Sequence, residues 1–76
     1  MLQEQFEIIG FFGDIIFFKF EEKLVTISNK LPKADLILRL KIEPEDIKSI
    51  RDEILVQASK RPLTYEDKEK LIKGKV

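Results

Sequence analysis

The chain is a small, electrically balanced polypeptide of 76 residues, with 14 lysines and arginines against 14 aspartates and glutamates. It contains no cysteine, histidine or tryptophan, which excludes disulfides, thiol catalysis, zinc fingers and a histidine-based catalytic triad. Its neutral charge argues against a nucleic-acid-binding domain that works by overall attraction, because such domains are usually basic. We expect a single domain, 1–76, with a sheet half (1–42) and a helical half (43–76).

The composition and the start of the chain give coarse expectations about origin and location. Isoleucine and lysine each occur 11 times and arginine three times, a bias typical of proteins from hot environments and equally of AT-rich genomes. The N-terminus lacks the basic segment of a signal peptide. The longest apolar stretch, 8–18, has 11 residues, whereas a membrane-spanning helix needs about 20. We therefore expect a cytoplasmic protein without a transmembrane segment.

The N-terminal half predicts a β-hairpin. Two segments rich in phenylalanine and isoleucine, 6–12 and 15–20, flank the pair Gly13-Asp14. Glycine followed by aspartate suits a two-residue type II′ turn, because glycine supplies the positive φ of the first position. The sequence therefore predicts two antiparallel strands joined by a tight turn.

Two further strands are predicted after the hairpin. A charged turn at 21–23 leads to a short strand at 24–28, and Pro32 marks the segment 29–35 as a loop. The segment 36–42 alternates apolar and other residues, with four apolar side chains on one face: Leu36, Leu38, Leu40 and Ile42. This alternation is typical of a half-buried strand.

A helix is predicted after the fourth strand. Pro44 fits the first helical position, and the acidic residues after it suit the positive end of the helix dipole. An apolar stripe at helical spacing follows: Ile47, Ile50, Ile54 and Ala58. Pro62 ends this helix. The predicted fold is α+β, with a small antiparallel sheet of three to four strands followed by two helices (β-β-β-β-α-α) and the first helix packed on one sheet face.

The second predicted helix is short and begins near Thr64. Thr64 and Asp67 have the spacing of a capping box, and Gly74 is a suitable C-terminal stop. Only three side chains of this helix are apolar: Tyr65, Leu71 and Ile72. A helix with so little apolar surface must dock on the rest of the protein to persist.

A two-residue turn fixes which side chains share a face of the hairpin. It pairs Phe12 with Ile15 and, further along, Ile9 with Phe18. The face assigned to the main core carries Ile9, Phe11, Ile16, Phe18, Phe20, Val25 and Ile27. The opposite face carries five more apolar side chains: Phe6, Ile8, Phe12, Ile15 and Phe17. Apolar residues on both faces are unusual for a hairpin that covers a single core.

Three interpretations of the second face remain open. The C-terminal helix or the loop 29–35 covers it, or a second copy of the chain covers it in a homo-oligomer, or it contacts another protein or a membrane surface. We interpret the five residues Phe6, Ile8, Phe12, Ile15 and Phe17 as a protein interface. The expected function is a non-enzymatic protein–protein interaction module, self-associating through this hairpin face, in a small regulatory or viral accessory protein.

No catalytic motif is found, and the acidic residues near Pro44 suit a helix start without a metal. We therefore predict no enzymatic activity, cofactor or metal site. The basic side chains gather near the C-terminus: Lys60, Arg61, Lys68, Lys70, Lys73 and Lys75. One interpretation of these basic residues is phosphate contact with nucleic acid, and nucleic-acid binding through 60–75 is the alternative function. The other interpretation is a solvated helix with Glu–Lys pairs four residues apart.

Overall fold

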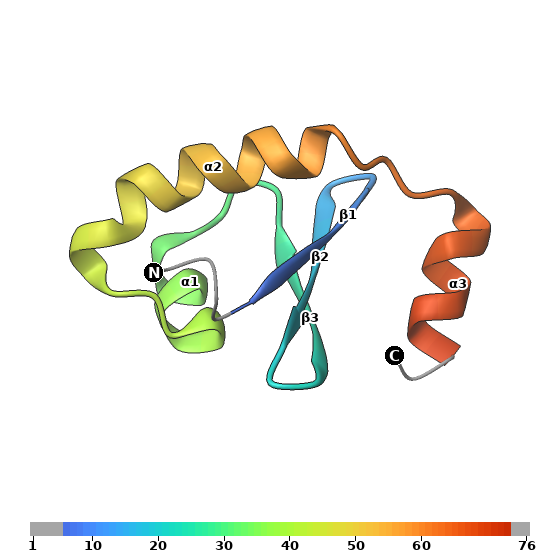
Figure 1. The fold of residues 1–76 in the computed structure, drawn as a ribbon, viewed down its shortest axis with the longest axis horizontal. Helices are drawn as coiled ribbons and strands as arrows, with labels where there is room; N and C mark the ends of the chain where they lie inside the picture. Colours follow the sequence, from blue (N-terminus) through green and yellow to red (C-terminus); the bar gives the residue numbers. More distant parts are fainter. Residues whose placement is uncertain (1–5, 74–76) are drawn as a thin grey trace.

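The structure is a computed structural model that describes residues 6–73, so the predictions for Gly74 and Lys75 lie outside the described residues. A three-stranded antiparallel sheet in the order β1-β2-β3 is followed by helices (Figure 1). The elements are β1 (Glu7–Phe12), β2 (Ile15–Phe20), β3 (Lys23–Ser28), α1 (Lys33–Leu40), the 3₁₀ helix η2 (Pro44–Asp46), α2 (Ile47–Ser59) and α3 (Tyr65–Lys73). The predicted α+β class is confirmed; over residues 6–73 the sheet has three strands, without the predicted fourth one, and there are three α-helices where two were predicted.

The tip of the first hairpin has the predicted turn and register. Gly13 has a φ of +62°, and Phe12 pairs with Ile15 while Phe11 pairs with Ile16. The prediction fails further from the turn, because a β-bulge makes Ile8, rather than Ile9, the partner of Phe18. An extra residue in one strand moves all residues before it to the opposite face. The bulge therefore exchanges the predicted positions of Ile8 and Ile9.

Close packing at Gly10 accompanies this bulge. A Cβ atom at Gly10 would collide with the carbonyl oxygen of Arg61 and the side chain of Leu63. The strand thus bends where the segment after α2 approaches its backbone, which only glycine permits.

The second turn consists of Glu21 and Glu22, both with positive φ, at 53° and 68°. Strand β3 consequently begins at Lys23, one residue earlier than predicted. This two-residue turn places Val25 opposite Phe18 and Ile27 opposite Ile16, so both lie on the predicted face. These four side chains face the core.

The predicted fourth strand, 36–42, is wrong, because this segment lies mostly in α1. Leu36 and Leu40 are buried one helical turn apart, whereas Leu38, predicted to share their face, is 71% exposed. Leucine, lysine, arginine and alanine are all good helix formers. The helix ends where Lys41 adopts a left-handed conformation and the N–H of Ile42 donates to the carbonyl of Leu36 at 3.3 Å. The sheet half predicted for 1–42 therefore also contains a helix.

Helix α2 packs over one face of the sheet, as predicted for the first helix. Its apolar stripe, Ile47, Ile50, Ile54 and Ala58, is buried. The stripe joins the core side chains of β2, among them Ile16 and Phe18, and those of α1. In Figure 1, α2 runs along the top of the molecule and its C-terminal end leads past the tip of β1 to α3.

Helix α3 begins with the predicted capping box. The N–H of Asp67 donates to Oγ1 of Thr64 at 3.0 Å, and the N–H of Thr64 donates to Oδ2 of Asp67 at 3.2 Å. None of the side chains of α3 is fully buried. The helix therefore depends on a few contacts with the hairpin for its position.

Candidate protein-interaction site

The bulge divides the five residues predicted as a protein interface between the two sheet faces. Phe6 and Ile8 pack against the edge of the main core, and the ring of Phe6 meets that of Phe18 edge-on, with 5.6 Å between the centroids. The assignment of Phe6 and Ile8 to the second face was therefore wrong. Phe12, Ile15 and Phe17 lie on that face, since they follow the bulge and keep the predicted register.

The segment that follows α2 lies against β1 at the level of Phe17. The N–H of Phe11 donates to the carbonyl of Arg61 at 3.1 Å, and the N–H of Leu63 donates to the carbonyl of Phe11 at 2.8 Å. Leu63 lies over Gly10, the cross-strand partner of Phe17, and Phe17 is only 3% exposed. The centre of the second face is thus covered by this chain itself.

Helix α3 contacts the same face near the hairpin tip. The rings of Tyr65 and Phe12 lie 6.3 Å apart, and Nζ of Lys68 lies 5.1 Å from the Phe12 centroid and 4.8 Å from the Tyr65 centroid. Such cation–π contacts are worth about 0.5–1 kcal/mol at exposed sites. Ile15 stays outside this contact and is 43% exposed.

The basic residues predicted for nucleic-acid contact do not all face one way. Lys68 lies over the two rings, and Nζ of Lys73 is 3.4 Å from a carboxylate oxygen of Glu69. Nη1 of Arg61 donates to the carbonyl oxygen of Ile8 at 3.3 Å. Lys60 and Lys70 are exposed. Acidic and basic side chains are thus interspersed along α3, whereas Lys60 and Arg61 precede it without an acidic neighbour in sequence.

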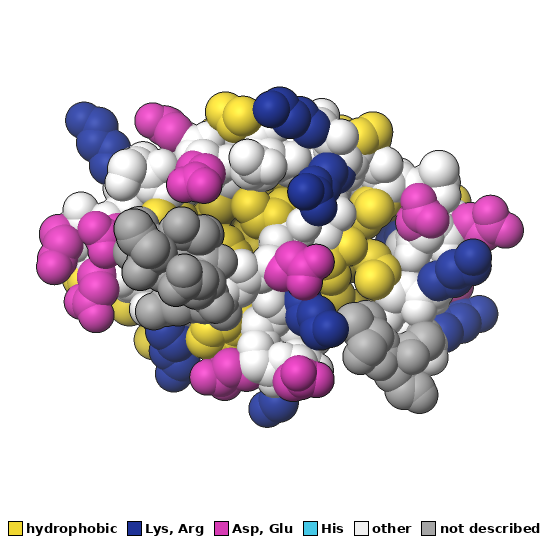
Figure 2. All heavy atoms as spheres, viewed as in Figure 1, with side chains coloured by type: hydrophobic (Ala, Val, Ile, Leu, Met, Phe, Trp, Pro, Cys, Tyr) yellow, Lys and Arg dark blue, Asp and Glu magenta, His cyan; other side chains and the backbone are white. Residues whose placement is uncertain are grey.

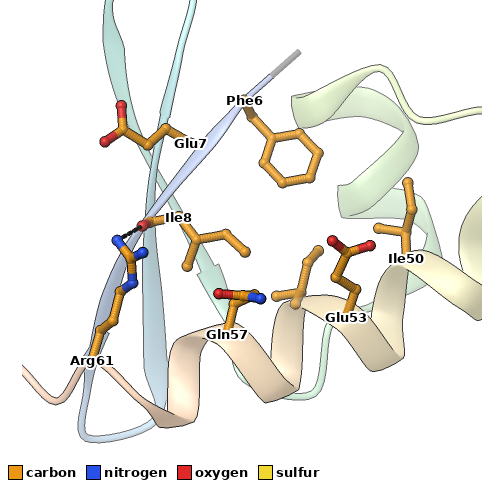
Figure 3. A pocket seen from close by; sticks show the side chains of 8 residues that line it. Phe6, Glu7, Ile8, Ile50, Glu53, Gln57 and Arg61 are labelled. Atoms are coloured by element: carbon orange, nitrogen blue, oxygen red, sulfur yellow. Dashed lines mark hydrogen bonds between the residues drawn. The ribbon is translucent and has the colours of Figure 1, made fainter. Parts of the chain in front are cut away.

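A groove between β1 and α2 was not predicted from the sequence. It has a volume of about 240 Å³ and is lined by eight residues: Phe6, Glu7, Ile8, Ile50, Glu53, Ile54, Gln57 and Arg61. Hydrophobic side chains show in the hollow beneath α2 (Figure 2). In the close view, Glu53 and Gln57 rise from α2 along one wall, and Arg61 reaches across to Ile8 (Figure 3). The groove therefore has an apolar floor and a polar rim.

The β1 edge of this groove presents an outward-facing backbone donor at Ile8. In an antiparallel strand, the N–H and C=O of one residue face the neighbouring strand and those of the next face away. Both outward groups of Phe11 are bonded to the segment after α2. The bulge makes Ile8 the next outward-facing residue, as its bond from Arg61 indicates. The N–H of Ile8 therefore faces away from β2, and no hydrogen bond to it from outside the sheet is found among residues 6–73.

A weak sequence signal marks the helical wall of the groove. Glu53, Gln57 and Arg61 recur every four residues beside the apolar stripe of α2, so they form a polar row along its border. This row alone does not reveal the groove. The opposite wall is formed by β1, and the bulge decides whether Ile8 faces α2.

Within residues 6–73, no three carboxylates gather as a metal site would require. No helix in this part of the chain has the length and apolarity to cross a membrane. No protein-family model, curated protein sequence or solved structure matches the chain.

Proposed function

We propose that the protein is a non-enzymatic module that binds another protein, and that the groove between β1 and α2 is its binding surface. The observation that carries this proposal is the outward-facing N–H of Ile8, which has no partner outside the sheet among residues 6–73, at a strand edge beside an apolar pocket. An extended segment that adds to a sheet edge gains affinity from main-chain hydrogen bonds and specificity from side chains placed in adjacent pockets.

The hydrogen bond that Ile8 now makes with Arg61 can be replaced by hydrogen bonds with an added strand. In the free protein, Arg61 satisfies the carbonyl oxygen of Ile8. An added strand supplies a backbone N–H for that oxygen and a carbonyl for the N–H of Ile8. A large apolar side chain buried in the groove contributes roughly 1.5–3 kcal/mol before the entropy cost of ordering the segment.

Selection from a phage-displayed library of random heptapeptides tests this function. The half-buried residue Gln57 lines the groove, so Gln57→Trp fills it without removing a core side chain. Val56 lies on the same helix, is 51% exposed and does not line the groove, so Val56→Trp is the matched control. The proposal predicts peptides that bind the wild type and Val56→Trp but not Gln57→Trp. Equal recovery on all three proteins would contradict it.

A second candidate is self-association through the second sheet face, which Ile15 favours because it stays 43% exposed beside Phe12. Sedimentation of the wild type and of Ile15→Lys tests this candidate. A wild-type dimer that Ile15→Lys dissociates would support it, and a monomeric wild type would exclude it. Phe17 is unsuitable for this test because it is buried.

The nucleic-acid alternative gains no comparable support. Lys68 and Lys73 are engaged within the described chain, and the exposed Lys70 follows Glu69 directly. Retardation of single-stranded DNA at two salt concentrations tests it, because phosphate binding weakens steeply with salt.

A further inference from the structure

We infer that the groove between β1 and α2 takes an extended peptide that places an apolar side chain in the pocket and a lysine or arginine, two residues away, beside Glu53. This inference rests on the proposed function and names the chemistry of the partner.

The size of the groove favours a side chain over a small-molecule ligand. Pockets for small molecules usually measure about 300–1,000 Å³, whereas this groove measures about 240 Å³. Its floor is formed by aliphatic and aromatic groups of Ile8, Ile54 and Phe6. One large apolar side chain therefore suits it.

The strand edge determines which peptide residues face α2. In an extended chain, side chains alternate between the two faces, so residues two apart share a face. When one side chain enters the pocket, the residues two positions before and after it also point toward α2. One of these positions meets Glu53, whose carboxylate projects over the groove next to Ile50 (Figure 3).

The groove is electrostatically polarised along α2. Glu53 lies six residues, about 9 Å of helix rise, before Ser59, the last residue of α2, and Arg61 follows beyond that end. Arg61 is held at the carbonyl of Ile8 and does not neutralise the Glu53 end. Glu7 also lines the groove, opposite Lys19 in the strand register, and it lies on β1 rather than on α2. Glu53 is therefore the acidic group of the α2 wall, which the peptide side chains facing α2 meet.

Titration of ¹⁵N-labelled full-length protein with two blocked heptapeptides tests the inference. The first is Ac-Thr-Lys-Thr-Leu-Thr-Lys-Thr-NH₂, and the second carries glutamate in place of both lysines. The amide signal of Ile8 reports binding at the strand edge. We expect the lysine peptide to move this signal in a saturable way, with an affinity at least about threefold above that of the glutamate peptide, as expected for exposed ion pairs.

Variants on α2 separate the charge preference from groove binding itself. Glu53→Gln should remove most of the preference for lysine, whereas Asp52→Asn, an exposed neighbour that does not line the groove, should retain it. Equal affinities for the two peptides, or a preference unchanged in Glu53→Gln, would overturn the inference and leave groove binding intact. If neither peptide moves the Ile8 signal, the inference fails, and the library selection decides separately whether the groove binds any peptide.

Discussion

Nη1 of Arg61 donates a hydrogen bond to the carbonyl oxygen of Ile8, 3.3 Å away, although the two residues are 53 positions apart in the chain. This contact joins the end of α2 to the edge of β1 and closes one end of the groove. It also protects part of an edge strand that would otherwise present both backbone groups of Ile8 to other chains.

Replacement of Arg61 should destabilise the protein modestly and open the strand edge. Arg61→Ala removes the side-chain bond but keeps the backbone bond from the N–H of Phe11 to the carbonyl of residue 61. A hydrogen bond from a charged donor contributes about 1.5–3 kcal/mol, and exposure reduces this to about 1 kcal/mol here. Urea unfolding measures the loss. Lys60→Ala is the control, and an equal loss in both variants would contradict this role for Arg61.

Gly10→Ala should be far more destabilising than Gly13→Ala. A Cβ at Gly10 meets the Arg61 carbonyl and Leu63, whereas a Cβ at Gly13 meets nothing within 4 Å. Gly13→Ala incurs only the cost of a left-handed residue, about 1–2 kcal/mol. Gly10→Ala must also displace the segment after α2, so its loss should exceed 2 kcal/mol. Thermal unfolding followed by circular dichroism ranks the two, and the reverse order would argue against the close approach at Gly10.

Two leucines of α1 should respond very differently to truncation. Leu40 is fully buried and Leu38 is 71% exposed. Leu40→Ala should reduce the free energy of unfolding by about 2–5 kcal/mol, and Leu38→Ala should change it by less than about 0.5 kcal/mol. Chemical denaturation distinguishes the helix from the strand predicted over 36–42, in which both side chains share a buried face. Comparable losses for both variants would favour the strand.

Removal of the Lys68 amine should loosen α3. Lys68→Ala removes both cation–π contacts with Phe12 and Tyr65, so amides of α3 should exchange with solvent about 2- to 5-fold faster, corresponding to about 0.5–1 kcal/mol. Hydrogen–deuterium exchange measures this effect. The exposed Lys70 on the same helix provides the control, because Lys70→Ala leaves the contacts with both rings in place.

Short sequence patterns correctly predicted the first turn, the buried face of α2 and the start of α3, because each of these features depends on neighbouring residues alone. Gly13-Asp14 determines the first turn, the isoleucine stripe determines the buried face of α2, and Thr64 with Asp67 begins α3. Each of these signals acts over a few residues and needs no knowledge of distant contacts.

The failures arise where tertiary contacts decide between local alternatives. The segment 36–42 satisfies a period of two, yet Leu36 and Leu40 also satisfy helical spacing, and packing against the core favours the helix. The bulge beside Gly10 accommodates the approach of Arg61 and Leu63 from about fifty residues later. A glycine within a strand, such as Gly10, is a signal for such an irregularity, but it does not tell where the extra residue lies. That position decides which face of the sheet Phe6 and Ile8 occupy, and hence whether the groove forms.

Hydrogen–deuterium exchange at the N–H of Ile8, with and without a saturating peptide selected on the wild-type protein, tests groove binding most directly. If the peptide adds as a strand to β1, this N–H gains a hydrogen bond, and its exchange should slow at least about tenfold. Exchange at Ile8 that stays unchanged at saturation would contradict the proposal that this edge and the adjoining groove form the binding surface.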